Sequence, residues 1–440
     1  MHRRELLKRT GLAATGLALG ASLPLGISSL AAAQDAQKLL VWDTLNDPSR
    51  GGVIEGLAKS FEAAHAGVTV EHRGWATEEL GQTLPRSVDS KQGPAVAQVN
   101  NGEALAGPMI RAKQLVSLVE YTKKYGWDTK LPEGLIARNR FSPDGKTFGS
   151  GNLWGVSAEA EIVGFYYNKK VFKDASVEVP KTFEEFETVL AALRSAGQEP
   201  LVFGTLDKWQ SIHLFGELQG TFTTRKYLDD LIYRRGDASF ADPSMVDAAN
   251  KVIDWKGKDF FMQGFEGVKG DDATALFAAG TGAILLQGSW AAGGVAEGLK
   301  DDAGFFLMPP HEGGSPVLNV GGVGIPYSIT TNAADPDLAA AFIDTLVSKE
   351  AFDAFIAAGV LPAGKIPANQ IKADTLSGDL YANWNAALAS DGIGHYLDWA
   401  APGAFYDTLT GQLQELLGGK TDAAKFTTAL QEAYAASFTS

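Results

Sequence analysis

Short apolar runs alternate with amphipathic stretches through the first part of the chain. Residues 38–42 form an apolar run typical of a buried strand, and similar runs lie at 68–72 and 95–99. Between the first two runs, apolar residues recur at helical spacing over 52–65. Strands that alternate with helices in this way favour parallel sheets covered by helices on both faces. We therefore expect an α/β fold.

The same alternation continues to the end of the chain. Residues 141–154 are rich in Gly, Ser, Asn and Pro and predict turns. Thr182, with Glu185 three residues later, predicts a capping box at the start of a helix. The expected later strands lie at 162–167, 282–287 and 304–308. The expected later helices cover 183–196, 209–218, 273–279, 405–417 and 423–438.

Polar and aromatic residues follow the first three predicted strands. In open parallel sheets, ligands gather at the loops beyond the carboxyl ends of the strands. Asn is also a common turn residue, so each of these positions has an ordinary structural interpretation as well. The candidates chosen by position are Asp43, Asn46, Trp75, Asn100 and Asn101.

The first 33 residues have the pattern of an export signal. A basic start precedes an apolar stretch over 11–27, and three alanines at 31–33 offer a cleavage site. The apolar stretch is short for a membrane span and contains glycines and a proline. The pair Arg3-Arg4 resembles a twin-arginine export signal, although His2 and Leu6 depart from the usual pattern. An ordinary secretory signal with paired arginines is the alternative.

The amino-acid composition excludes several kinds of functional site and disfavours some binding partners. The chain has no cysteine, which excludes disulfides, thiolate metal sites, cysteine nucleophiles and a lipid-anchored cysteine. We therefore expect a soluble protein that an outer membrane retains in the periplasm. The formal net charge is −14, and the predicted signal holds four basic residues and one acidic one, so the remaining chain is more acidic still. An acidic protein repels nucleic acid and anionic lipid.

The chain is longer than one hydrophobic core usually supports, so we expect two domains.

The sequence contains little that would indicate an enzyme. Nucleophile-elbow, zinc-protease, EF-hand and P-loop motifs are absent from the sequence, and the six histidines are scattered. Glu159 and Glu161 could serve a glycosidase, but they would share one strand instead of flanking a bond from opposite sides. We expect no catalysis, metal or cofactor.

Four segments resemble, in order, the bacterial extracellular solute-binding proteins of family 1, the group that includes maltose-binding protein. The first joins GFYYNKKVF at 164–172 to PKTFEEF at 180–186. The second joins FAAGTGAI at 277–284 to GSW at 288–290. The third joins FLMP at 306–309 to GGVGI at 321–325, and the fourth is a helix that begins with AAAFI at 339–343. Together they span most of the chain after the signal.

The resemblance implies a two-lobe periplasmic-binding-protein fold of type II, with a mainly parallel sheet in each lobe and a hinge crossed several times. The amino-terminal lobe would comprise 36–157 plus 309–347, and the carboxy-terminal lobe 158–308 plus 348–440. A solute would bind in the cleft between the lobes, which would close over it. The implied partners are a carbohydrate ligand and the permease subunits of an ABC importer. We expect a monomer.

A sugar site combines aromatic planes for the ring faces with hydrogen-bonding groups for the hydroxyls. Trp290 corresponds to a stacking tryptophan of the family, and Gly288 before it lets backbone come close. Glu161 resembles a carboxylate that contacts sugar hydroxyls, and Glu159 is its neighbour on the same face of the strand. A salt bridge at the hinge is the alternative for this pair.

Other aromatic residues are candidates with an open assignment. Trp209 begins a predicted helix of the second lobe, where relatives often place a ligand contact. Either Trp399 or Tyr406 corresponds to a stacking aromatic near the start of the helix at 405–417, but the register is open. Packing is the alternative for each. Rival solutes are a polyamine, a metal chelate or an organophosphate.

Overall fold

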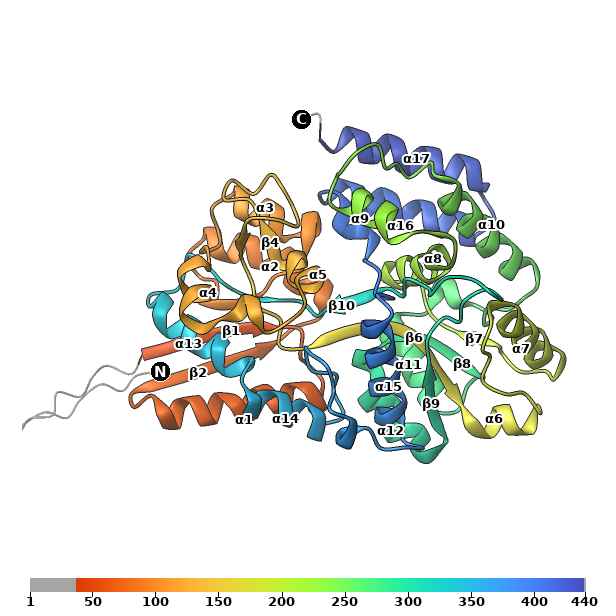
Figure 1. The fold of residues 1–440 in the computed structure, drawn as a ribbon, viewed down its shortest axis with the longest axis horizontal. Coiled ribbons are helices and arrows are strands. Elements are labelled where there is room, and N and C mark those ends of the chain that lie inside the picture. Colours follow the sequence, from red (N-terminus) through yellow and green to blue (C-terminus); the bar gives the residue numbers. More distant parts are fainter. Residues whose placement is uncertain (1–36, 439–440) are drawn as a thin grey trace, which may run out of the picture.

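The computed structural model describes residues 37–438, which form two α/β lobes (Figure 1). The predicted signal peptide, with its twin-arginine pair, lies outside the described residues. None of the helices in the described part combines the length and hydropathy needed to traverse a lipid bilayer.

The sheet of the first lobe has the order β11-β3-β1-β2. The predicted strands are confirmed as β1 (Gln37–Asp43), β2 (Val68–Gly74) and β3 (Val96–Gln98), and β1 pairs in parallel with both of the others. The edge strand β11 (Tyr327–Ile329) returns from the second lobe and pairs antiparallel with β3. Far-separated segments of the chain thus complete one sheet.

Helices cover both faces of this sheet, as the pattern predicts. On one face α1 (Pro48–Ala64), α13 (Pro336–Leu346) and α14 (Lys349–Ala357) pack with alternate residues of β1. The other face packs against α2 (Thr77–Asp89) and α3 (Ala106–Arg111). Helix α1 begins four residues earlier than the predicted 52–65, because Asp47 caps it and Pro48 occupies its first turn.

Smaller elements complete the first lobe. They are α4 (Val119–Tyr125), α5 (Glu133–Ile136), β4 (Arg140–Phe141) and β5 (Asn152–Leu153). The segment 141–154, expected to be turns only, is closed at its ends by the short antiparallel pair β4–β5.

The second sheet contains β6 (Ala160–Asn168), β7 (Leu201–Val202), β8 (Ile284–Gly288), β9 (Ala303–Phe306) and β10 (Gly321–Val323). Strand β6 pairs antiparallel with β8, β9 and β10, whereas β7 and β8 are parallel. The expectation of mainly parallel pairing is therefore wrong for this lobe. Strand β6 follows the segment that comes from the first lobe, and it is antiparallel to each strand with which it pairs.

The second lobe contains ten helices of the described chain (Figure 1). They are α6 (Lys169–Asp174), α7 (Phe183–Ser195), α8 (Trp209–Phe222), α9 (Arg225–Ile232), α10 (Pro243–Gly257), α11 (Gly270–Ala278), α12 (Ala292–Leu299), α15 (Leu376–Ala389), α16 (Ala404–Leu417) and α17 (Ala423–Ala436). The predicted Thr182 cap is confirmed, since its hydroxyl accepts from the Glu185 amide at 3.1 Å. Helix α8 is buried from Gln210 to Gly220, so it is the central helix of this lobe.

Three chain segments pass side by side between the lobes. The first leads into β6, the second joins β10 to β11, and the third joins α14 to α15. Backbone hydrogen bonds tie them together at Glu159, whose carbonyl accepts from the Gly324 amide at 2.9 Å, and at Ala160, whose amide donates to the Leu361 carbonyl at 2.9 Å. The residues at this hinge are therefore held by segments far apart in sequence.

Two segments pack differently from the predicted lobe division. The amide of Phe183 donates to the carbonyl of Pro310, and the amide of Val320 donates to Glu217 of α8. Residues 310–320, assigned to the first lobe, thus pack on the second. Conversely α14, assigned to the second lobe, packs on α1 and α13 of the first. The sequence motifs therefore give only approximate positions for the points at which the chain passes from one lobe to the other, because packing decides those points.

Candidate functional site between the lobes

Two carboxylates occupy the hinge strand where it enters the second lobe. Glu159 precedes β6 and is buried, and Glu161, on β6, is partly buried. Burial raises the pKa of Glu159 to about 8 and that of Glu161 to about 7, and the charge of Arg50 only partly opposes both shifts. Neither forms an ion pair within residues 37–438, so the alternative of a hinge salt bridge is not what the structure contains.

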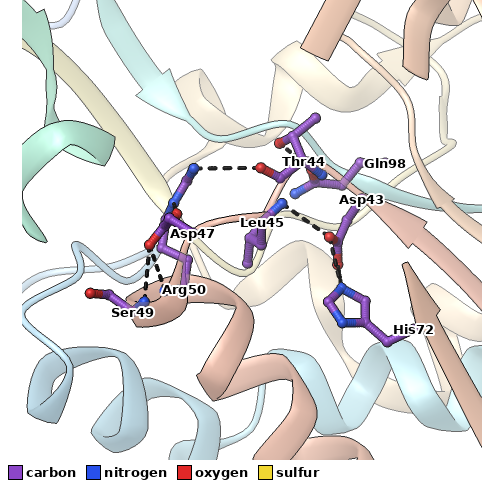
Figure 2. A network of polar contacts seen from close by, with 8 residues as sticks. All are labelled: Asp43, Thr44, Leu45, Asp47, Ser49, Arg50, His72 and Gln98. Carbon is purple, nitrogen blue, oxygen red and sulfur yellow. Dashed lines mark hydrogen bonds and ion pairs between the residues drawn. The ribbon is translucent and has the colours of Figure 1, made fainter. Parts of the chain in front are cut away.

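Arg50 is the cation whose charge acts on these carboxylates. It lies in the first turn of α1, where its Nε contacts Asp47 at 2.5 Å and its Nη2 donates to the Thr44 carbonyl at 3.4 Å (Figure 2). Asp47 also caps the helix by accepting from the amides of Ser49 and Arg50. Sequence reasoning missed Arg50, although its place after the first strand could have suggested it.

Asp43 proves to be a structural residue. Its side chain is fully buried, and it accepts from His72 Nε2 at 2.9 Å and from the Leu45 amide at 3.0 Å (Figure 2). It also accepts from the Tyr327 hydroxyl at 2.8 Å. Burial alone would lower the pKa of His72, but the hydrogen bond and charge of Asp43 raise it. The prediction that Asp43 contacts a ligand does not fit these contacts. Asn46, three residues later, is exposed.

An aromatic wall lines the second lobe. Trp209, at the start of α8, lies 6.1 Å from Trp290 between ring centroids, and both indoles are partly exposed. Trp290 belongs to η5 (Ser289–Ala291), which follows β8. His213, one turn along α8 from Trp209, has its ring 5.6 Å from that of Trp290 and 5.4 Å from that of Tyr396. The Tyr396 hydroxyl donates to Glu161 at 3.4 Å, so this wall reaches the hinge carboxylates.

A glycine lies against each of the two indoles and limits where its ring can lie. Trp290 folds back over Gly288, and a Cβ at Gly288 would overlap its ring. A Cβ at Gly270 would lie 2.5 Å from the ring of Trp209. Gly288 was predicted to let backbone approach a ligand, whereas in the structure it makes room for the indole.

Trp75 stands on the first lobe. Its ring lies 4.8 Å from that of Trp42, and the guanidinium of Arg73 stacks 3.5 Å from its centroid. Its Nε1 is buried and has no hydrogen-bond partner in the described chain. Trp75 thus belongs to a separate aromatic group on the first lobe, with one face covered by Arg73.

The two lobes touch where η1 (Gly102–Ala104) meets η8 (Leu397–Ala400). Trp399 is buried here against Gly102, whose φ of +63° and close approach both require glycine. Burial raises the pKa of Asp398 at this contact, and the nearby Asn100 side chain of the first lobe partly opposes that shift. Asn101 is buried and donates to Asn139 at 2.6 Å, so it stabilises the first lobe. Of the two C-terminal aromatic candidates, Trp399 therefore packs.

Tyr406 has the more open position of that pair. It is partly buried at the start of α16, and burial together with the charges of Asp398, Glu78 and Asp207 raises its pKa. Glu78 belongs to α2 of the first lobe, so Tyr406 lies near acidic groups from both lobes. Asp207 has one carboxylate oxygen without a partner in the described chain, and burial raises its pKa.

A second contact between the lobes brings Trp290 towards Arg50. A Cβ at Gly293, in the first turn of α12, would lie 2.7 Å from the hydroxyl of Ser49 in α1. The start of α12, which follows Trp290 in the chain, therefore meets the start of α1, which holds Arg50. The structure thus groups Trp209, Trp290, Tyr396 and Tyr406 of the second lobe with Glu161, Glu159 and Arg50 at the hinge. Within residues 37–438 no group of three or more metal-ligating side chains is placed to hold a metal ion.

A family model of the bacterial extracellular solute-binding protein matches residues 47–351, which is more than half of the chain. This chain belongs to that family. In this solute-binding protein the match begins at Asp47, the cap of α1, and ends in α14. It therefore includes the hinge carboxylates and both indoles of the wall.

Curated relatives are more distant. An uncharacterised ABC transporter extracellular-binding protein of Pyrococcus horikoshii is 23% identical over 57% of this chain and 56% of its own length. The multiple sugar-binding protein of Streptococcus mutans is 22% identical over 46% of this chain and 49% of its own. The chain thus spans about half the length of these two relatives.

Solved structures share the fold of this solute-binding protein over nearly its whole length. A chitin oligosaccharide binding protein superposes with a TM-score of 0.78 over 92% of this chain and 99% of its own, at 22% identity. A raffinose complex of the binding protein RafE superposes with a TM-score of 0.68 over 90% and 98%, at 19% identity. The two-lobe α/β fold expected from the sequence is confirmed.

Proposed function

We propose that this protein captures a sugar or oligosaccharide between its lobes and delivers it to the permease of an ABC importer. The observation that carries the proposal is the pair of partly exposed indoles, Trp209 and Trp290, that glycines hold in place beside Glu161. Flat aromatic faces stack on the C–H face of a pyranose ring, and carboxylates accept hydrogen bonds from its hydroxyls. Named relatives that bind sugars support the same class of solute.

Entry of a solute requires the lobes to separate. Trp399 of the second lobe packs on Gly102 of the first, and Gly293 packs on Ser49, so these two contacts border the proposed site. We infer that a hinge motion about the three crossing segments opens them and that bound sugar favours closure. The closed surface would then dock on the permease.

The proposal includes the setting of the protein. The predicted signal supports export, through the twin-arginine machinery or the general secretory route, to a periplasm in which the protein acts as a soluble monomer without a lipid anchor. We propose binding without catalysis, since the two hinge carboxylates lie two residues apart in one segment of the chain and cannot flank a glycosidic bond.

A solute that carries an amine is the second candidate. Burial raises the pKa of Asp207 and of Glu161, and it raises that of Asp398, close to Tyr396 and Tyr406, to about 6. Carboxylates that form no ion pair and lie near aromatic rings suit an ammonium group. A polyamine would satisfy these features, and the test below separates it from a neutral sugar.

The proposal is tested by thermal unfolding of the mature protein with galactose, raffinose, maltotriose, xylotriose and diacetylchitobiose, and with spermidine as the amine. A sugar at 100 times its dissociation constant should stabilise the native state by about 2.7 kcal/mol. We expect at least one sugar to raise the melting temperature and W290A to abolish the rise. A matched variant, W127A, removes a buried tryptophan of the first lobe and should keep the response. A rise with spermidine alone would overturn the sugar assignment.

A further inference from the structure

His213 is a buried polar side chain without a hydrogen-bond partner. Only 6% of the residue is exposed, and its Nδ1 is fully enclosed. No hydrogen bond to either ring nitrogen is formed by residues 37–438. The buried imidazole of His395 differs in having a partner at one nitrogen: its Nε2 donates to Asp229 at 2.8 Å, although its Nδ1 is unpaired. An unpaired buried polar group is costly, so one that persists in a packed helix calls for a partner.

The surroundings of His213 indicate where that partner lies. Its ring centroid is 5.0 Å from that of Trp209, 5.6 Å from that of Trp290 and 5.4 Å from that of Tyr396. Trp209 precedes it by four residues on α8, so the two rings share one face of the helix. Trp290 comes from η5 and Tyr396 from the segment before η8. Three elements thus converge on one imidazole.

This group of rings is preformed. Gly288 lies under Trp290 and Gly270 lies under Trp209, and neither glycine could carry a Cβ without displacing an indole. The two indoles remain partly exposed although the imidazole between them is buried. The imidazole therefore forms the floor of a small aromatic subsite whose rim consists of Trp209 and Trp290.

The imidazole of His213 at this floor favours a neutral polar group on a ligand. Burial lowers the pKa of His213 to about 3, so the ring is neutral at physiological pH and presents one N–H donor and one acceptor nitrogen. Nδ1 is the enclosed nitrogen, so a ligand hydroxyl, which can both donate and accept, would pair with Nε2. An anion is disfavoured, because the carboxylate of Glu161 meets the Tyr396 hydroxyl at the same wall.

We propose that the imidazole of His213 hydrogen-bonds one hydroxyl group of the bound sugar, between the indoles of Trp209 and Trp290. This proposal rests on the proposed function and adds the residue that decides which sugar isomer is accepted. Aromatic stacking tolerates many pyranoses, whereas a hydrogen bond at a buried floor demands a hydroxyl in one position. His213 is therefore a specificity-determining residue for the solute.

The test is calorimetric titration of the wild-type protein, H213F and H213Q with the five sugars named above. H213F keeps the ring volume but loses both nitrogens, and H213Q retains a polar group near the position of Nε2. We expect H213F to weaken the tightest sugar by about tenfold or more, and H213Q by about threefold or less. The control H65F changes a histidine at the end of α1 and should bind as the wild type does.

Monodeoxy derivatives of the tightest sugar complete the experiment. For the wild type, one derivative should bind about tenfold more weakly than the parent sugar. For H213F, the same derivative and the parent sugar should bind with equal affinity, because the hydrogen bond is already lost. Melting temperatures without sugar check that each variant folds, and H213L replaces H213F if that variant does not. Equal affinity of H213F and wild type for every sugar would overturn the proposal for His213 while leaving sugar binding intact. Failure of all five sugars to bind the wild type would overturn the proposed function itself.

Discussion

The indole of Trp290 lies directly over the Cα atom of Gly288, two residues earlier in the chain. No side chain larger than hydrogen fits between them, since a Cβ would overlap the ring. Strand β8 ends at Gly288, and η5 turns the chain so that Trp290 folds back on it. One glycine thus decides the orientation of the residue most strongly expected to stack on a sugar.

Replacing this glycine should damage binding more than folding. In G288A the new methyl group would push the indole away from His213, and we expect sugar affinity to fall about tenfold. Overpacking should lower the free energy of unfolding by about 1–3 kcal/mol. Titration calorimetry and urea unfolding measure the two effects. The control G294A places a methyl group into open space on α12 and should change neither by much. Unchanged affinity in G288A would show that the indole orientation is unimportant.

The hinge carboxylate Glu159 should make stability depend on pH. Burial raises its pKa to about 8, above the value of about 4.5 in the unfolded chain, so the folded protein holds a proton that the unfolded chain has lost. Stability should fall as the pH rises from about 5 to about 8. The groups that act on it are Arg50, Glu161, Asp43 and Asp47.

The variant E159Q mimics the protonated carboxyl group and tests this dependence. We expect it to be more stable than the wild type at pH 8, by about 1–3 kcal/mol, and no more stable at pH 4.5. Urea unfolding at several pH values measures the difference, with E266Q at an exposed position as control. A constant difference between E159Q and wild type across this range would contradict a raised pKa at Glu159.

Arg138 should be a stabilising link between the lobes. Its guanidinium, from the first lobe, donates to the carbonyl of Gly321 in β10 and to that of Ile393 in the second lobe, the latter at 3.1 Å. Removing it in R138A leaves the Gly321 carbonyl without this donor, whereas the Ile393 carbonyl still accepts from Arg225. We expect a loss of about 1–3 kcal/mol in the free energy of unfolding. The exposed Arg86 gives the control R86A. A loss no greater than that of R86A would show that the link contributes nothing.

Asp43 should act on stability and not on solute affinity. Its charge raises the pKa of His72, so the stability that this pair contributes is fully present below about pH 6.5 and is lost as the pH rises through the folded-state pKa. We expect D43N to be less stable by about 1–3 kcal/mol at pH 5.5 and by less at pH 9. Sugar affinity should stay within about threefold of the wild type. A large loss of affinity without a loss of stability would restore Asp43 as a ligand contact.

Much of the fold follows from local sequence. The strands at 38–42, 68–72 and 95–99 and the helix capped by Thr182 were predicted from periodicity and capping chemistry, which depend on residues close together in the chain. The expected parallel pairing in the second lobe is wrong for β6, which is antiparallel to its neighbours. Pairing depends on which segments meet it, and β10 lies more than 150 residues later.

The residues of the candidate site were likewise predicted only in part. The sequence indicated Trp290, Trp209 and Glu161, because short motifs and strand ends mark such positions. It gave Asp43 the same standing as Asn46, and it did not single out Arg50 or His213.

What the sequence by itself determined is the series of strands and helices, the absence of cysteine chemistry and the membership of a solute-binding family. Only the tertiary structure decided that Asp43 is enclosed by His72 and Tyr327, whereas Arg50 acts on the hinge carboxylates. Burial and pairing arise from contacts between residues distant in sequence, from 29 positions for Asp43 and His72 to 284 for Asp43 and Tyr327, and no local sequence pattern predicts them. The unpaired imidazole of His213 is visible for the same reason only in the folded protein.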